Sequence, residues 1–405
     1  MRTWDLIVVG AGPAGAAAAR TAAGLGIETL ILEAEEFPRP KPCAGGISGA
    51  ALKELGEPLP PGVAGRPCRA IRPRYGDLAV TVCREETLVE VVHRDRFDAH
   101  LLSLARRAGA EVRQGVRVEV AEPDPEGVAL RTREGVWRAR VVIGADGAQS
   151  RVGLAVRPPF ARREVGVCQV GELPLRPSDY GAFFVDGLEV WYNNPLKGYG
   201  WIFPQDSGLN VGIGSVARHL PYPRREFSGF LALAGLPEPK RVKGAVLPLG
   251  GRPRLGQAGR ILLAGDALGV ADPFTGEGIR YALISGRLAG ECAARALHRA
   301  PAYPDLSSYS KCCWKGFNQD LRYAWWFARL YLSLGQRLNR LVFRHPGLFS
   351  RVADIMAGQG TYRQLVGELG HRIPSYWVSG LVNRNPASGQ RARSATPSAR
   401  HPGRE

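Results

Sequence analysis

Short apolar runs rich in β-branched residues predict the buried strands of a parallel sheet. Two of them, Leu6–Val9 and Glu28–Leu32, flank an alanine-rich segment of high helix propensity. A hairpin over residues 127–143 ends in a third apolar strand, and Ile261–Ala264 forms a fourth. The pattern predicts an α/β fold.

Elsewhere apolar and polar positions alternate, which is typical of antiparallel strands. Residues 67–93 contain such stretches, and residues 155–255 combine them with many aromatics and turns. Between the two, an amphipathic helix begins at Arg94, with an apolar face formed by Phe97, Leu101, Leu102 and Leu104. The chain is again helical, and rich in aromatic residues, from about Ser307 to Phe349.

We therefore predict three parts and a tail. A Rossmann-like nucleotide-binding domain is discontinuous, an antiparallel β-sheet domain that holds the substrate is inserted into it, and a helical region follows. The nucleotide-binding domain comprises 1–66, 92–154 and 256–300, and the inserted domain comprises 67–91 and 155–255. The helical region is 301–384, and the tail, 385–405, has a composition that predicts disorder.

The first strand and helix are joined by Gly10, Gly12 and Gly15, which have the G-x-G-x-x-G spacing of dinucleotide sites. Gly10 permits a tight turn, Gly12 lets the backbone approach a pyrophosphate, and Gly15 lets helix and strand pack closely. The helix N-terminus provides N–H groups and the positive end of a dipole for phosphates. Glu33, which ends the second strand, is placed to accept a hydrogen bond from an adenosine ribose, and an acid there argues against a 2′-phosphate.

Composition narrows the class of protein. The 405 residues suffice for two or three domains, and no apolar run is long enough to span a membrane. Seven scattered cysteines without a C-x-x-C pair indicate a reducing cytoplasm and no metal site. Arginine supplies most of a net charge of +17, which reflects either codon usage or attraction to anionic lipid or an acidic redox partner. No nucleic-acid-binding motif accompanies it, and no feature predicts an oligomeric state.

The helical stretch after residue 307 carries many basic residues beside its aromatics. Two interpretations stay open: a C-terminal helical cap with a solvated basic face, or an amphipathic surface that faces the cytoplasmic side of a membrane. The basic residues are Lys311, Lys315, Arg322, Arg329, Arg337, Arg340 and Arg344.

Two further stretches carry candidate chemistry. Cys43 lies in a loop of prolines and paired glycines, where a catalytic or cofactor-contacting role and a structural role are both open. On a strand, Tyr199, Trp201 and Phe203 share one face and form a flat apolar wall, which suits an extended hydrocarbon. The alternative is an ordinary core strand.

Acidic residues also follow two of the buried strands, Asp146 at Gly144–Gly147 and Asp266 after Gly265. With the glycine fingerprint, these strand ends resemble the two-domain flavoproteins typified by aromatic hydroxylases, and the resemblance implies FAD as the dinucleotide. In that class Asp266 would bind the ribityl chain, and Arg94 would cross the cofactor near its pyrophosphate. The loop from Pro273 through Gly276 and Gly278 to Ile279 would face the flavin.

Within this class the chain resembles the geranylgeranyl reductase family. The run from Tyr199 to Pro204, followed by Gly212 and Gly214, matches the family pattern Y-x-W-x-F-P-x7-8-G-x-G. Lys41-Pro42-Cys43 resembles the family's K-P-C-G-G loop, with Ala44 in place of the first glycine. The predicted cofactor-binding residues are Gly10, Gly12, Pro13, Ala14, Gly15, Glu33, Cys43, Ala44, Gly46, Arg94, Val118, Asp146, Gly265, Asp266, Pro273, Gly276, Gly278 and Ile279. The predicted substrate residues are Tyr199, Trp201, Phe203 and Pro204.

The resemblance implies an FAD-dependent oxidoreductase that reduces C=C bonds of geranylgeranyl-type chains on a lipid, quinone or pigment precursor. Saturation of such a bond needs a proton as well as a hydride, and Cys43 and Tyr199 are the predicted catalytic residues that deliver it. A flavin monooxygenase or halogenase of the same fold, and an electron-transfer flavoprotein to quinone, are the alternatives. The single fingerprint leaves NAD(P)H or a ferredoxin as a transient electron donor.

Overall fold

A computed structural model describes residues 2–192, 198–333, 340, 343 and 347–369. The account below concerns the compact unit that ends at Leu365. The predicted tail, 385–405, lies outside the described residues, as do Arg337 and Arg344 of the basic stretch.

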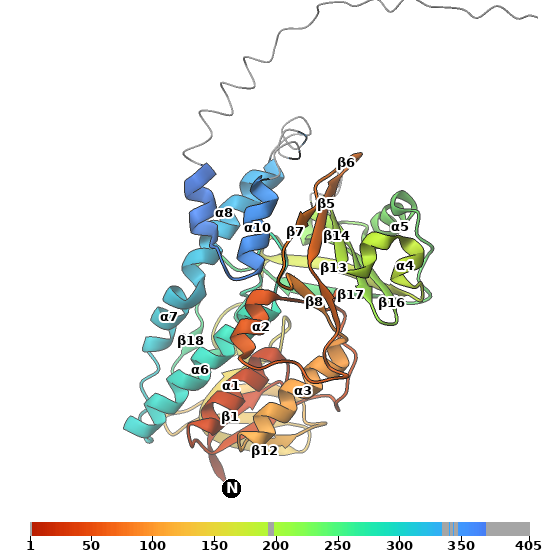
Figure 1. Ribbon diagram of the computed structural model, residues 1–405. Coiled ribbons are helices and arrows are strands. Elements are labelled where there is room, and N and C mark those ends of the chain that lie inside the picture. Colours follow the sequence, from red (N-terminus) through yellow and green to blue (C-terminus); the bar gives the residue numbers. More distant parts are fainter. Residues whose placement is uncertain (1, 193–197, 334–339, 341–342, 344–346, 370–405) are drawn as a thin grey trace, which may run out of the picture. The chain divides into compact units, whose positions relative to one another are not determined.

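The predicted parallel sheet is present, with eight strands: six in the order β10-β11-β12-β1-β2-β9, then β19 beside β12 and β18 beside β19 (Figure 1). Its parallel strands are β1 (Thr3–Val9), β2 (Thr29–Leu32), β9 (Glu111–Arg113), β12 (Gly135–Gly144) and β19 (Ile261–Leu263). Its antiparallel strands are β10 (Val118–Pro123), β11 (Val128–Thr132) and β18 (Gln257–Ala258). The hairpin predicted over 127–143 is confirmed as β11 and β12.

A second eight-stranded sheet has the order β17-β13-β16-β15-β14-β5-β6, with β7 beside β5. Its strands are β5 (Ala70–Tyr75), β6 (Leu78–Ala79), β7 (Val82–Cys83), β13 (Val165–Leu173), β14 (Gly187–Trp191), β15 (Gly198–Gln205), β16 (Gly208–Val216) and β17 (Val242–Pro248). The prediction of a purely antiparallel sheet is wrong at one pair, because β5 and β14 run parallel. They come from distant parts of the chain, so no hairpin fixes their relative direction.

A small third sheet joins these parts. It has the order β3-β8-β4 and comprises β3 (Gly46–Ser48), β4 (Arg66–Cys68) and β8 (Val89–Val91). Because β3 directly follows the Cys43 loop, the sheet fixes one end of that loop.

The helices comprise one group against the parallel sheet and one from the C-terminal part (Figure 1). The first group is α1 (Pro13–Gly24), α2 (Gly49–Leu55), α3 (Arg94–Arg107) and α6 (Ile279–Arg299). The second is α7 (Ser308–Cys313), a π-helical turn (Trp314–Asn318), α8 (Gln319–Ser333) and α10 (Gly347–Met356), in agreement with the predicted helical region. Helices α4 (Pro177–Tyr180) and α5 (Pro223–Ala234) belong to the second sheet's segment.

Helix α1 packs against α6 at backbone contact distance. A Cβ built on Gly286 would lie 2.1 Å from the carbonyl oxygen of Ala14, and one on Gly290 would lie 2.5 Å from that of Ala18. The alanines of α1 and these two glycines therefore let the helices approach each other more closely than larger side chains would allow. This contact fixes the N-terminus of α1.

The substitution Gly286→Ala should consequently destabilise the protein, by about 1–3 kcal/mol, because an added methyl group must displace the α1 backbone. Thermal unfolding followed by circular dichroism measures this as a lower midpoint. Gly229→Ala is the matched control, since Gly229 is also helical but a Cβ there meets nothing within 4 Å. The control should be stabilised by about 0.5–1 kcal/mol. Equal midpoints for the two variants would contradict the packing argument.

Candidate functional site

A cavity of about 1890 Å³ opens at the carboxyl ends of the parallel strands. Residues that directly follow β1, β2, β12 and β19 line it, which is where open α/β sheets bind their ligands. Strands of the second sheet and helices α8 and α10 line the rest. The predicted site residues, which are scattered along the sequence, therefore meet in one place.

The three fingerprint glycines have different surroundings. Gly10 has a φ of +96°, and a Cβ there would lie 2.5 Å from the Ala145 carbonyl oxygen. A Cβ on Gly15 would lie 1.8 Å from the Gly10 carbonyl oxygen, so Gly15 serves helix–strand packing and does not line the cavity. At Gly12 the nearest atom would be Nη2 of Arg39, 3.8 Å away. The space beside Gly12 is thus open to a ligand, and no side chain caps the helix that begins there.

Glu33 is held firmly at the edge of the cavity. Its side chain is buried, and its two carboxylate oxygens accept hydrogen bonds from the backbone N–H groups of Ala11 (2.6 Å) and Glu35 (2.9 Å). Each carboxylate oxygen can accept a further bond, so the group can still bind a ribose hydroxyl.

A buried charge network lies beside the fingerprint. The Asp98 carboxylate is fully buried and receives two 2.9 Å hydrogen bonds from the Arg94 guanidinium, and Arg39 lies 3.5 Å away. Burial opposes the charge of Arg94, but the Asp98 carboxylate raises its pKa above the ordinary value, and the Cys43 side chain is near enough to interact with it. Arg39 lines the cavity and was not predicted from the sequence. The sequence feature that could have indicated a role for Arg39 is its position between two prolines of the Cys43 loop.

Cys43 lines the cavity, and its loop is anchored through its backbone. Asn210 of β16 donates a 3.0 Å hydrogen bond to the Cys43 carbonyl and accepts a 2.9 Å bond from the indole N–H of Trp201. In the same loop, Gly45 has a φ of +78°, and a Cβ on it would lie 2.3 Å from the Val92 carbonyl oxygen. Glycine is therefore required at position 45, whereas position 44 holds alanine in place of the first glycine of the family's loop.

The two acidic residues at the strand ends differ in function. Asp146 accepts hydrogen bonds from the N–H groups of Arg151 (2.7 Å) and Val152 (3.1 Å) and from the Ser150 hydroxyl, so its side chain holds the following turn. The Asp266 carboxylate lines the cavity and has no hydrogen-bond partner among the described residues. Burial raises the pKa of Asp266, and Lys41 and Arg94 oppose this shift. A half-buried carboxylate without a protein partner suits the hydroxyl groups of a ligand.

The loop from Asp272 to Gly278 lies against the aromatic block. Asp272 accepts bonds from the N–H groups of Phe274 (2.7 Å) and Thr275 (3.1 Å), and the Tyr199 hydroxyl donates a 2.6 Å bond to the Thr275 carbonyl. Burial raises the pKa of Tyr199 well above its ordinary value. Gly276 has a φ of +72°, and a Cβ on it would meet the Tyr199 hydroxyl.

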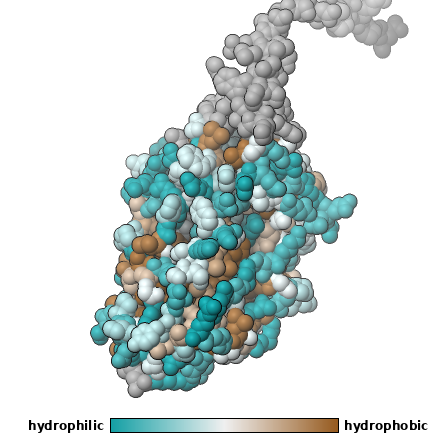
Figure 2. Space-filling model, turned by 90° about the vertical axis from the view of Figure 1, so that its left-hand side faces the viewer, coloured by the Kyte–Doolittle hydropathy of each residue, from teal (hydrophilic) through white to brown (hydrophobic). Residues whose placement is uncertain are grey.

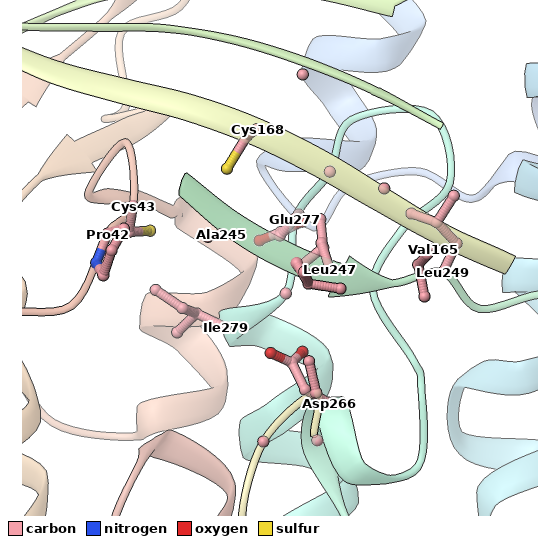
Figure 3. Close-up of a pocket in the computed structure, with 18 of the residues that line it drawn as sticks. Pro42, Cys43, Val165, Cys168, Ala245, Leu247, Leu249, Asp266, Glu277 and Ile279 are labelled. Carbon is pink, nitrogen blue, oxygen red and sulfur yellow. The ribbon is translucent and has the colours of Figure 1, made fainter. Parts of the chain in front are cut away.

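Glu277 belongs to the loop that was predicted to face the flavin, but no role was predicted for its side chain. It lines the cavity (Figure 3), and one of its carboxylate oxygens accepts a hydrogen bond from the Ser48 hydroxyl. Burial raises the pKa of Glu277 to about 7, against the opposing effect of Ser48. A G-E-G sequence gives no indication of this burial.

The predicted aromatic wall is confirmed as one face of β15. Tyr199, Trp201 and Phe203 all line the cavity, with the first two rings 6.1 Å apart. Pro204, also predicted to contact the substrate, does not line the cavity. Side chains alternate along a strand, and Pro204 lies on the opposite face.

The wall continues into an apolar arm of the cavity. The ring of Tyr192 stacks on Phe274 at 5.9 Å and contacts Tyr331 of α8 at 5.4 Å. Strands β5, β7, β8 and β14 and helices α8 and α10 provide the rest of the lining, which includes Ile71, Val82, Val89, Leu188, Val190, Ala328, Leu332, Phe349, Val352, Ala353 and Met356. The C-terminal helices thus form part of the site, which neither interpretation of the sequence anticipated.

With Gly15 and Pro204 set aside, the other predicted site residues all line this cavity, including Val118 of β10 and Ile279 at the start of α6. They are Gly10, Gly12, Pro13, Ala14, Glu33, Cys43, Ala44, Gly46, Arg94, Val118, Asp146, Tyr199, Trp201, Phe203, Gly265, Asp266, Pro273, Gly276, Gly278 and Ile279. Among the described residues, no group of three His, Cys, Asp or Glu side chains could hold a metal ion.

Comparison with known proteins identifies several relatives, although no protein-family model matches the chain. A digeranylgeranylglycerophospholipid reductase of Methanocella arvoryzae is 33% identical over 319 residues, which cover 73% of this chain and 78% of the relative. A menaquinone reductase of Mycobacterium tuberculosis is 32% identical over 321 residues, 71% of this chain and 76% of the relative.

Solved structures share the fold at lower identity. A geranylgeranyl bacteriochlorophyll reductase-like protein from Thermoplasma acidophilum has a TM-score of 0.78 at 24% identity, covering 92% of this chain and 99% of that protein. The flavin-dependent brominase Bmp2 has a TM-score of 0.68 at 17% identity, covering 92% of this chain and all of that one.

Proposed function

Because the chain belongs to the geranylgeranyl reductase family of FAD-dependent oxidoreductases, we propose that it saturates C=C bonds of geranylgeranyl-type isoprenoid chains. The observation that carries the proposal is the aromatic wall and apolar arm, which lead directly to the nucleotide-binding end of the cavity. Relatives and a structural neighbour are named for reactions on a phospholipid, a quinone and a bacteriochlorophyll, so a lipid, quinone or pigment precursor remains the proposed head group.

The cavity residues fit an FAD cofactor. Glu33 would bind the adenosine ribose, the open space at Gly12 with Arg39 and Arg94 would take the pyrophosphate, and Asp266 would bind the ribityl hydroxyls. The loop from Pro273 to Ile279 and the Cys43 loop would enclose the ring system. When bound and reduced, FAD supplies the hydride.

Gly12→Ala should release FAD while leaving the fold intact, since the added methyl group meets no protein atom within 3.8 Å but enters the space assigned to the pyrophosphate. Asp266→Ala should weaken FAD binding as well. Flavin absorbance of the purified variants and thermal unfolding measure the two effects separately. Gly24→Ala at the other end of α1 is the control and should keep its colour. Stoichiometric FAD in both site variants would show that the site is misplaced.

Saturation of an unpolarised alkene also requires a proton at the second carbon. Of the two residues predicted to deliver it, Tyr199 already donates its hydroxyl proton to Thr275, and burial raises its pKa. The Cys43 side chain instead contacts Arg94, whose guanidinium can only donate hydrogen bonds, so this contact does not use the thiol proton. These contacts favour Cys43 over Tyr199, whose ring then serves as part of the wall.

Reduction of a geranylgeranyl lipid should proceed without oxygen. With chemically reduced FAD, mass spectrometry should find about two mass units gained per reduced bond. Trp201→Ala should slow saturation more than it weakens FAD binding, because it removes wall and not cofactor contact. Phe230→Ala, in helix α5 packed against the other face of the same sheet, controls for a general loss of packing. Oxygen-dependent product without anaerobic saturation would favour the monooxygenase or halogenase, whose fold the brominase shares.

The electron donor is proposed to bind transiently, as NAD(P)H or a ferredoxin. Only one dinucleotide fingerprint occurs in the sequence, and FAD occupies it under this proposal. An electron-transfer flavoprotein without substrate chemistry is disfavoured, because the sequence has no cysteine spacing for an iron–sulfur cluster and the apolar arm would have no use.

Peripheral contact with an anionic membrane is a further part of the proposal. Trp314, Trp326 and Leu330 are each about half exposed on the outer side of the π-turn and α8, whose inner side lines the apolar arm. Exposed cations accompany them, namely Lys311, Lys315, Arg322 and Arg329. The face that contains these helices carries separate hydrophobic patches among hydrophilic residues (Figure 2). No helix among the described residues is long and apolar enough to cross a membrane.

Binding to anionic vesicles should therefore weaken steeply with salt, because separated surface charges are screened over about 10 Å at 0.1 M ionic strength. Sedimentation with vesicles of phosphatidylglycerol and phosphatidylcholine measures it. The double variant Lys311→Ser, Lys315→Ser should bind less. The double variant Arg131→Ser, Arg133→Ser, on β11 and its turn, removes the same number of charges and is the control. Equal partitioning to neutral and anionic vesicles would exclude this electrostatic mode.

A further inference from the structure

The proton for the second alkene carbon has a third possible source, which the sequence did not indicate. Glu277 lies in the loop that Tyr199 binds through Thr275, at the start of α6. Its side chain lines the cavity that also contains Cys43 and the aromatic wall. Figure 3 shows the Glu277 carboxyl group and the Cys43 sulfur directed toward the same cavity from different elements.

The bonding of Glu277 leaves one of its carboxyl oxygens available. One oxygen accepts the hydrogen bond from Ser48, whose own oxygen accepts a 3.1 Å bond from the N–H of Ala51 at the start of α2. The other oxygen has no hydrogen-bond partner among the described residues and lies in a residue that lines the cavity. The Ser48 hydrogen bond thus fixes one oxygen of the Glu277 carboxyl group, and the other oxygen of Glu277 can contact a ligand in the cavity.

The surrounding charges let the group keep a proton near neutral pH. Burial raises the pKa of Glu277 to about 7, and Asp272 raises it as well, whereas the Ser48 hydrogen bond and Arg280 lower it. Tyr281, the other titratable group beside it on α6, is neutral because burial raises its pKa far above the ordinary value. Arg280 is held toward α10 by a 3.4 Å bond to the Ile355 carbonyl, so Glu277 is not neutralised by a direct ion pair.

We propose that Glu277 is a catalytic residue, the acid that protonates the alkene during saturation. The inference rests on the proposed reductase function and names the group that completes it. One alkene carbon receives the hydride, with its two electrons, from the reduced cofactor. At the other carbon a C–H bond forms as the O–H bond of the Glu277 carboxyl group breaks. The carboxylate that remains regains a proton from water, so hydride and proton together account for the two hydrogen atoms gained.

The pH dependence follows from the direction of the pKa shift. The acid form is the active one, so the rate of saturation is high below a pH of about 7 and falls as the pH rises through this value. Because the Ser48 hydrogen bond stabilises the carboxylate, its removal raises the pKa of Glu277. Ser48→Ala should then move the fall in rate to higher pH, a change that a merely structural role would not produce.

The experiment compares FAD-loaded native enzyme with Glu277→Gln, Ser48→Ala and Cys43→Ala. Reoxidation of chemically reduced flavin by a geranylgeranyl lipid is followed anaerobically between pH 5.5 and 9. Glu277→Gln keeps an oxygen for Ser48 and should retain FAD, but should lose about 10²–10⁴-fold in rate together with the dependence on pH. Cys43→Ala should keep the pH dependence even if its rate is lower.

A second measurement needs no substrate. The infrared band of a protonated carboxyl group should titrate near neutral pH in the native enzyme and be missing in Glu277→Gln. Native rate and pH dependence in Glu277→Gln would overturn the inference, as would loss of the pH dependence in Cys43→Ala alone. If the native enzyme shows the infrared titration but does not saturate the lipid, the proposed function is wrong. The role of Glu277 as the acid that protonates the alkene is then wrong as well.

Discussion

Backbone contact without intervening side chains is the constraint on which the nucleotide-binding end of the site depends. Gly15 and Gly286 bring α1 against the Gly10 turn and against α6, at distances where any Cβ would collide with a carbonyl group. The N-terminus of α1 is thereby fixed at the carboxyl edge of the parallel sheet. Gly12 is the exception among the fingerprint glycines, because the space beside it belongs to no protein atom. Close packing at Gly10 and Gly15 together with the open space at Gly12 provides the arrangement that the proposed pyrophosphate contact requires.

The second sheet is attached to this end by a few polar contacts that all involve the cavity loops. Trp201, Asn210 and the Cys43 carbonyl form one chain of hydrogen bonds, and Tyr199 binds Thr275. Ser48 of the small third sheet binds Glu277 in the same loop as Thr275. Each contact places an apolar or titratable side chain beside the region assigned to the flavin ring. The cavity therefore changes in character along its length, from buried arginines at the fingerprint to an apolar arm under α8 and α10. That gradient suits a polar cofactor and a hydrocarbon meeting end to end.

The fold alone does not select this chemistry, since a brominase shares it at 17% identity. The site makes the distinction. Its aromatic wall lies on one strand face and is extended by side chains of four further strands and two helices, all of them apolar or aromatic. Glu277, Cys43 and Tyr199 are titratable groups that line the same cavity as the wall, and their different hydrogen bonds give them different capacities to release a proton.

Local features could be predicted from the amino-acid sequence alone: the strand–glycine–helix unit, Glu33, the period-2 aromatic face, and the special loop at Cys43. These depend on neighbours within a few residues, so spacing and residue type suffice to predict them. Tertiary structure decided the rest. Arg39 and Glu277 became site residues because Asp98 and Ser48, distant in sequence, bury and orient them. The parallel pairing of β5 with β14 and the lining of the apolar arm by α8 and α10 likewise join segments more than a hundred residues apart. No local pattern encodes which distant segment will exclude water from a side chain, and that exclusion sets the pKa of Glu277.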